Sequence, residues 1–137
     1  MQDWLKLFPL WSRGASLLLW MGVIFFFSSL PGSPYPFEPT WSYFLERKSA
    51  HVMEYAVLTI LAVRFVYAAF PRETFLNILL AATLFSVAYG SSDELHQFFV
   101  PYRGAKISDV LIDSLGALSL ACVYYALYRK KSRLSRP

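Results

Sequence analysis

Ionisable residues crowd into one short stretch of a chain that is otherwise mostly apolar and aromatic. Asp93, Glu94, His96, Gln97 and Arg103 all fall within eleven residues. If this stretch is helical, positions i, i+3 and i+4 share one face, which predicts that Asp93, His96 and Gln97 point the same way. Carboxylates beside an imidazole can exchange protons or bind a metal near neutral pH. We therefore interpret this stretch as the centre of a functional site.

Two other places in the chain repeat the same helical spacing of polar groups. His51 and Glu54 form one pair, and Asp109 and Asp113 form the other. Ionisable residues inside a membrane span cost at least ~2.5 kcal/mol each and usually face a cavity or a partner. We expect the three places to meet at one membrane face and to form a single polar pocket.

The composition favours a membrane protein. Hydrophobic residues make up 56 % of the 137 residues and charged residues 16 %, below the roughly 25 % charged share of soluble domains. The basic residues lie at the chain ends and between apolar runs, so the net charge of +4 does not indicate nucleic-acid binding. A single cysteine, Cys122, excludes an intramolecular disulfide and any cysteine-pair metal site.

Four apolar runs predict an all-α bundle of four transmembrane helices in one domain, residues 1–137. The predicted spans are about 14–30, 49–70, 74–90 and 109–128, followed by a basic tail over 129–137. Basic residues before the first run also fit a signal peptide. The sequence after Ser29 is a poor cleavage site, so we expect a retained anchor.

The connections carry turn and cap signals. Four prolines within residues 31–39 predict a loop outside the hydrocarbon. A short amphipathic helix is expected over 40–48, with Trp41 and Phe44 toward the lipid headgroups, and Ser49 is the expected cap of the second span. Proline at 101 predicts a turn over 101–104.

Small residues predict where helices come close. Gly116, Ala117 and Ser119 would allow close contact of the last helix with a neighbour. Gly90 is interpreted as a turn glycine, and so is the glycine at 104, because no glycine-rich phosphate loop is present. Ser108 is the expected N-cap of the last helix.

The basic residues predict the orientation. The tail carries five basic residues and no acid, which places it in the cytoplasm by the positive-inside rule. Four spans then put both termini in the cytoplasm, with nine basic residues inside and four outside. We expect a protein of the bacterial inner membrane whose polar pocket opens on the extracytoplasmic side.

Each polar residue has an expected role, and alternatives remain open. The residues expected to be catalytic are His51, Asp93, Glu94, His96 and Asp109; those to bind substrate are Lys48, Gln97 and Arg103; those to give support are Glu54, Tyr55, Asp113 and Gly116. In one alternative, Glu54 and Asp113 only pair with basic groups to hold the helices. Asp109 lies in a helix first turn, where the dipole stabilises a carboxylate with no other role.

A divalent metal is a second alternative for the same site. Two histidines and two carboxylates suit zinc, manganese or iron. The candidate ligands are His51, Glu54, Asp93 and His96. No tight ligand motif is present. Without a metal, the same groups can do general acid–base work.

Three motifs resemble the VanZ-like family of small bacterial membrane proteins. They are Lys48-x-x-His51-x-x-x-Tyr55, Ser92-Asp-Glu-x-His-Gln-x-Phe-x-Pro-x-Arg103 and Ser108-Asp-x-x-x-Asp113-x-x-Gly116. The resemblance covers about residues 20–128. It implies a role at the cell envelope and a link to glycopeptide tolerance, because the family is named for a teicoplanin-resistance determinant. It implies no particular reaction.

Three classes of function follow from these residues. The first is an envelope enzyme that modifies or hydrolyses a lipid-linked or lipid phosphate substrate, with Lys48 and Arg103 holding the anion and His51 or His96 as acid or base. The second is a non-catalytic accessory protein that protects envelope precursors from glycopeptides. The third is a proton-coupled carrier, for which four spans would have to dimerise. The expected partners are the bilayer and a lipid-linked envelope precursor, and the oligomeric state is left open.

The orientation can be tested by cysteine labelling in intact cells. In a chain with Cys122 replaced by serine, a cysteine at Ser33 or Arg103 should react with a membrane-impermeant thiol reagent before lysis. A cysteine introduced at Arg72 should react only after lysis. The opposite pattern at Ser33 would refute the predicted topology.

Overall fold

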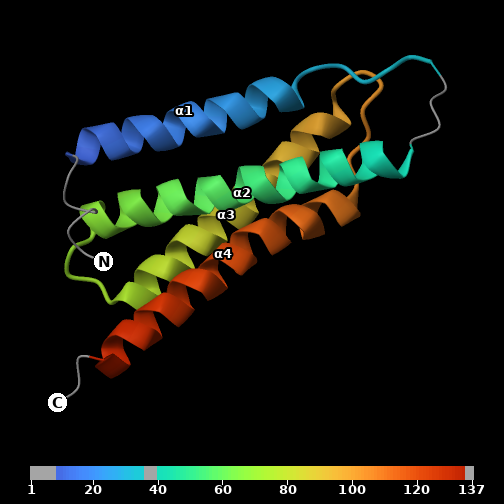
Figure 1. Cartoon of the computed structure of the whole chain (residues 1–137). Helices are drawn as coiled ribbons and strands as arrows, with labels where there is room; N and C mark the ends of the chain where they lie inside the picture. The colour runs from blue at the N-terminus through green and yellow to red at the C-terminus, as the bar shows by residue number, and fades with distance from the viewer. Residues whose placement is uncertain (1–8, 36–39, 135–137) are drawn as a thin grey trace.

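The computed structural model is an all-helical bundle and describes residues 9–35 and 40–134. Its four helices are α1 (Leu10–Ser28), α2 (Trp41–Ala69), α3 (Phe75–Phe98) and α4 (Ile107–Leu134). Each is long enough and apolar enough to cross a membrane. The predicted all-α, four-helix architecture is therefore confirmed (Figure 1).

Helix α2 is the centre of the bundle. It packs against the other three helices, whereas α1 contacts α2 and α3 but not α4 within the described part of the chain. The chain reverses at each connection, so α2 and α4 run parallel to each other and antiparallel to α1 and α3 (Figure 1). Residues 29–35 and 99–106 lie at one end of the bundle, which we call the site end (Figure 1).

The helices extend beyond the predicted spans. The separate short helix expected over 40–48 is wrong, because α2 is continuous from Trp41. Its N-cap is Thr40, whose side chain accepts a hydrogen bond from Tyr43 N at 3.3 Å, and Ser49 lies inside the helix. Helix α4 likewise begins before Ser108, at Ile107. Predictions for residues 1–8, 36–39 and 135–137 concern positions outside the described residues.

Glycine at 116 brings the parallel helices α2 and α4 into backbone contact. A Cβ built on Gly116 would lie 2.4 Å from the carbonyl oxygen of Val52. Gly116 and Ala117 are buried, as the predicted close helix contact requires, whereas Ser119 is exposed. In a membrane, where lipid competes with apolar side chains, such close approach is a main source of helix association.

Gly90 is not a turn glycine. It lies within α3, which continues through the polar motif to Phe98. A Cβ built on Gly90 would lie 3.1 Å from Cε1 of Tyr55 and 3.3 Å from Cβ of Asp113. The absent side chain makes room for these two buried residues, so the glycine serves packing of α3 against α2 and α4.

The predicted proline turn is present and positions Arg103. Val100 O accepts a hydrogen bond from Arg103 N at 3.1 Å, and Pro101 is the first central residue. The second, Tyr102, has φ 57°, the left-handed conformation that a type II turn demands. Gly32 N donates to Pro101 O at 3.0 Å. A Cβ on Gly32 would lie 1.9 Å from Tyr102 O, so the turn packs directly on the segment after α1.

Alanine at Gly116 should push α2 and α4 apart. Overpacking costs about 1–3 kcal/mol, whereas alanine in an open helix site gains up to about 1 kcal/mol over glycine. Gly22 in α1 has no atom within 4 Å of a built Cβ and is the matched control. Thermal unfolding in detergent should give a lower Tm for Gly116→Ala and an unchanged or higher Tm for Gly22→Ala. Equal Tm values would contradict the close contact.

Candidate functional site

A salt bridge and a contact between a histidine and a carboxylate join α2 to α4 at the site end. Lys48 Nζ forms a salt bridge with Asp109 Oδ1, and His51 Nδ1 lies 2.9 Å from Asp113 Oδ1. Lys48 and His51 are three residues apart on α2, and Asp109 and Asp113 are four residues apart on α4, so each pair lies on one face of its helix. Because the two helices run parallel, the two contacts lie one after the other along the same interface. Both members of the predicted α4 pair, Asp109 and Asp113, therefore face α2, where they meet Lys48 and His51, whereas Glu54 lines the neighbouring cavity.

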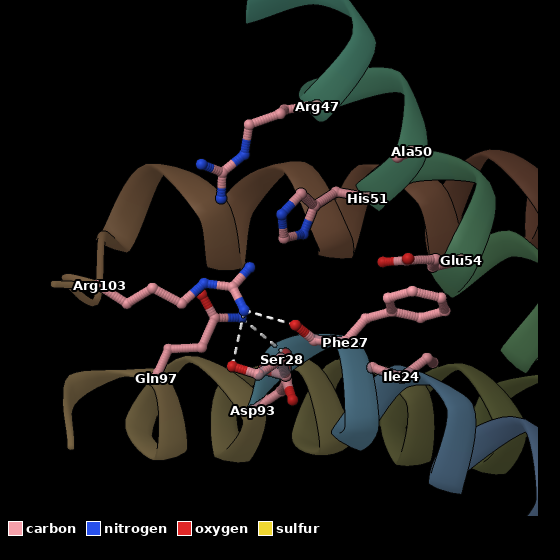
Figure 2. Close-up of a pocket in the computed structure, with 10 residues that line it drawn as sticks. All are labelled: Ile24, Phe27, Ser28, Arg47, Ala50, His51, Glu54, Asp93, Gln97 and Arg103. Atoms are coloured by element: carbon pink, nitrogen blue, oxygen red, sulfur yellow. Dashed lines mark hydrogen bonds between the residues drawn. The ribbon is translucent and has the colours of Figure 1, made fainter. Parts of the chain in front are cut away.

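A cavity of about 130 Å³ lies beside His51 at the site end. Its wall combines two arginines, two carboxylates and apolar side chains from α1 (Figure 2). The lining residues are Ile24, Phe27 and Ser28 from α1; Arg47, Ala50, His51 and Glu54 from α2; Asp93 and Gln97 from α3; and Arg103. Three helices and the turn thus contribute to one amphiphilic cavity.

Arg103 fastens the turn to the end of α1. Its Nη1 donates to the carbonyl oxygens of Phe27 and Ser28, both at 2.6 Å (Figure 2). These carbonyls belong to the last turn of α1, where a cation is favoured by the helix dipole. Burial, with repulsion from Arg47 as a further cause, lowers the pKa of the Arg103 guanidinium from its usual value. The guanidinium of arginine is not deprotonated in proteins, so Arg103 keeps its positive charge.

The α3 carboxylates are each held by one oxygen. Asp93 Oδ2 accepts from Gln97 Nε2 at 2.9 Å, and Glu94 Oε2 accepts from the backbone N of Lys106 at 3.0 Å. The other oxygens, Asp93 Oδ1 and Glu94 Oε1, are buried and have no hydrogen-bond partner among the described residues. Gln97, expected to bind substrate, thus orients Asp93.

Further unpartnered polar atoms lie on α2 and α4. Asp113 Oδ2 and the hydroxyl of Tyr55 are buried without a hydrogen-bond partner in the described part of the chain. A buried polar group left without a partner costs about 1–3 kcal/mol. Carboxylate oxygens in this state can take up a proton or bind a cation. The buried oxygens therefore have unused hydrogen-bonding or coordination capacity that a ligand could satisfy.

The structure does not bring His96 into this cavity. Its Nε2 lies 2.9 Å from Ser29 Oγ, and its ring stacks on Phe25 with centroids 4.5 Å apart. The expectation that both histidines share one pocket is wrong. His96 lies toward the side of α3 that packs against α1, whereas Asp93 and Gln97 line the cavity. His96 therefore ties α1 to α3.

Most of the other predicted site residues gather where expected. His51, Glu54, Asp93, Gln97 and Arg103 line the cavity. Glu94, Asp113, Tyr55 and Gly116 are buried at or beside it, at helix contacts. Lys48 and Asp109 bind each other next to it. Their assigned chemical roles remain predictions.

Sequence reasoning missed Arg47 as a member of the site. It lies four residues before His51 and so on the same helix face. The spacing would have identified it, had the second span been extended upstream to Trp41. Ser28, Ile24 and Phe27 of α1 were also missed, because nothing in the sequence says which neighbour an apolar helix covers.

Four membrane-length helices with a buried polar cluster at one end define a multi-pass membrane protein. The family model described as VanZ/LLP1 matches residues 14–128. The chain therefore belongs to the VanZ-like family. No match was found among curated proteins or among solved structures.

The contact between Lys48 and Asp109 can be measured with a double-mutant cycle. The side chains are 20 % and 12 % exposed, so solvent screens the pair in part, and we expect a coupling of about 1 kcal/mol. Asp109→Asn should cost more than the ~0.5–1 kcal/mol expected from charge loss at a helix start alone. Unfolding of Lys48→Met, Asp109→Asn and the double variant gives the coupling. Strictly additive effects would contradict a stabilising pair.

Proposed function

We propose that this VanZ-like protein acts in the bacterial cell envelope, where it binds and hydrolyses a phosphate-bearing lipid or lipid-linked compound. The observation that carries the proposal is the cavity that joins two arginines to an apolar wall at the end of a membrane bundle. A glycopeptide-tolerance role, which the family suggests, would follow from action on an envelope precursor.

Two arginines favour an anion with several acceptor oxygens. Arg47 and Arg103 reach the cavity from α2 and from the turn. Guanidinium groups suit phosphate, because their donors form a planar fork. The cavity volume of about 130 Å³ is well above the ~10–15 Å³ that one water molecule needs, so there is room for a small anionic group.

The apolar wall favours a substrate carried on a lipid. Ile24 and Phe27 line the cavity, and Phe25 and Phe26 are exposed next to them on α1. We propose that the site end faces the outer surface of the inner membrane, with both termini in the cytoplasm. A lipid chain could then lie along α1 while its phosphate reaches the arginines.

Hydrolysis is the reaction that we assign to this cavity. A water oxygen forms a bond to phosphorus, the bond between phosphorus and the lipid oxygen breaks, and a proton from the water passes to that lipid oxygen, so that the lipid alcohol and inorganic phosphate leave. The two arginines stabilise the charge on the transferred phosphoryl group, as is usual for this chemistry. Asp93, Gln97 and Glu54 line the same cavity, and we assign to this polar side of it the positioning of the attacking water.

A second candidate is a non-catalytic accessory protein that binds envelope precursors. The observation that favours it is mutual pairing: His51 with Asp113 and Lys48 with Asp109 both hold α2 to α4. Groups engaged in this way serve packing specificity in some proteins. Release of inorganic phosphate from lipid extracts separates the two candidates, because only the enzyme releases it.

Arg47→Gln should cut phosphate release by at least ~100-fold, the loss typical of removing one donor to a developing anion. Arg47 is exposed, so the variant should still fold. Arg72→Gln, at the opposite end of the bundle, is the matched control and should keep full activity. The assay uses purified protein in detergent with bacterial lipid extract. No phosphate release by the unmodified protein, or equal rates for both variants, would reject the enzyme.

A further inference from the structure

Three helices carry buried carboxylate and hydroxyl oxygens that lack hydrogen-bond partners in the described part of the chain. Asp113 is 1 % exposed, Glu94 is 3 % exposed and Tyr55 is fully buried. Asp113 Oδ2, Glu94 Oε1 and the Tyr55 hydroxyl all lack a hydrogen-bond partner among the described residues. Ionised carboxylates accept hydrogen bonds but donate none, so they cannot satisfy one another. A bound cation would satisfy these carboxylate oxygens.

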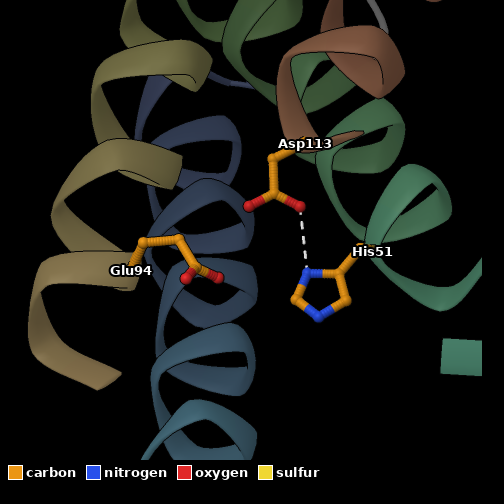
Figure 3. A group of neighbouring side chains, drawn as sticks. All are labelled: His51, Glu94 and Asp113. Carbon is orange, nitrogen blue, oxygen red and sulfur yellow. Dashed lines mark hydrogen bonds and ion pairs between the residues drawn. The ribbon is translucent and has the colours of Figure 1, made fainter. Parts of the chain in front are cut away.

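The ligand geometry fits one metal ion. His51 on α2, Glu94 on α3 and Asp113 on α4 each offer one ligand atom, and these atoms lie within 4.8 Å of one another (Figure 3). Metal–ligand bonds of about 2.0–2.2 Å place two ligands at most about 4.4 Å apart. Small side-chain rotations are enough to close the difference. The three ligand residues lie on three separate helices, so only the folded bundle brings them together.

The contacts of Glu94 and Asp113 leave one oxygen of each without a partner in the described part of the chain. Glu94 Oε2 accepts from the backbone N of Lys106 at 3.0 Å, and its other oxygen, Oε1, has no partner in the described residues. Asp113 Oδ1 contacts His51 Nδ1, which leaves Oδ2 without a partner. On binding, the contact between the ring and the carboxylate is exchanged for bonds of both to the cation. The contact from Lys106 N to Glu94 would remain, and outer contacts of this kind orient the ligands of metal sites.

The donor set selects the class of metal. One imidazole nitrogen with two carboxylates suits zinc, manganese or iron, whereas calcium and magnesium prefer oxygen alone. Two carboxylates neutralise a divalent ion, which favours the ion in a buried site where free charge is costly. Three protein ligands leave a coordination position open, as catalytic metal sites do.

We propose that His51, Glu94 and Asp113 bind one divalent first-row transition-metal ion. This set shares only His51 with the ligands suggested by sequence spacing, since His96 lies against α1 and Asp93 is held by Gln97. His51 also lines the cavity, so the ion would lie next to the proposed phosphate position. Binding of the ion does not depend on the proposed function; only its use in hydrolysis does.

The test is metal binding to the full-length protein. Protein purified in detergent and stripped with a chelator is titrated with Zn²⁺ alone, and bound metal is measured by equilibrium dialysis. We expect one ion per chain at micromolar Zn²⁺. Glu94→Gln, Asp113→Asn and His51→Gln should each weaken affinity by at least ~10-fold, the lower range even for loss of an outer partner of a metal site.

Matched variants make the outcome decisive. His96→Gln removes the only other histidine, and Glu73→Gln removes an exposed carboxylate at the far end; both should bind Zn²⁺ like the unmodified protein. Loss of binding in His96→Gln with retention in Glu94→Gln and Asp113→Asn would overturn the site. So would the absence of one-to-one binding. Glu94→Gln and Asp113→Asn are close in shape to the native residues, and a thermal unfolding curve checks that they fold.

Failure of the metal site and failure of the proposed function give different results. Arg47→Gln should keep its Zn²⁺ affinity, because Arg47 is not a ligand. Zn²⁺ binding without phosphate release would reject only the hydrolase. Phosphate release that depends on Arg47, in a protein that binds no Zn²⁺, would reject only the metal site.

Discussion

The close contact between the parallel helices α2 and α4 is the constraint on which the site depends. Gly116 lies against the carbonyl of Val52, one turn from the contact between His51 and Asp113. If α4 moved outward, Asp113 would remain buried without its histidine, which is strongly destabilising. Packing and polar contact therefore support each other, and a membrane supplies little hydrophobic force to replace them.

Helix α1 covers this arrangement and is fastened to it by hydrogen bonds. Trp20 Nε1 donates to Glu54 O at 3.0 Å, and the hydroxyl of Tyr89 donates to Met21 O at 2.7 Å. At the site end, Arg103 holds the last carbonyls of α1. Helix α1 does not contact α4 in the described residues, and its Ile24, Phe27 and Ser28 form one side of the cavity. The position of α1 at this side of the cavity is the reason for proposing a substrate carried on a lipid.

The buried acids at the site end work against stability. Asp93, Glu94 and Asp113 come from two helices and retain oxygens without partners in the described chain. In a membrane such groups are expensive, and apolar residues of similar size would pack without this cost. Buried polar groups without partners are typically kept at sites where a protein binds a ligand or carries out a reaction. The proposed cation would satisfy the unpartnered acids, and the proposed phosphate next to it would satisfy the two arginines of the cavity.

The sequence alone determined four helices and the gathering of polar residues at one end, because hydropathy and helical spacing are local properties. It did not determine how far the helices extend: α2 continues upstream and brings in Arg47. Only the tertiary structure decided that His51 faces the acids while His96 faces α1. The rotation of a helix about its axis is set by which neighbours pack against it. For the same reason Gly90 became a packing position within α3, since the space it vacates belongs to residues far away in the chain.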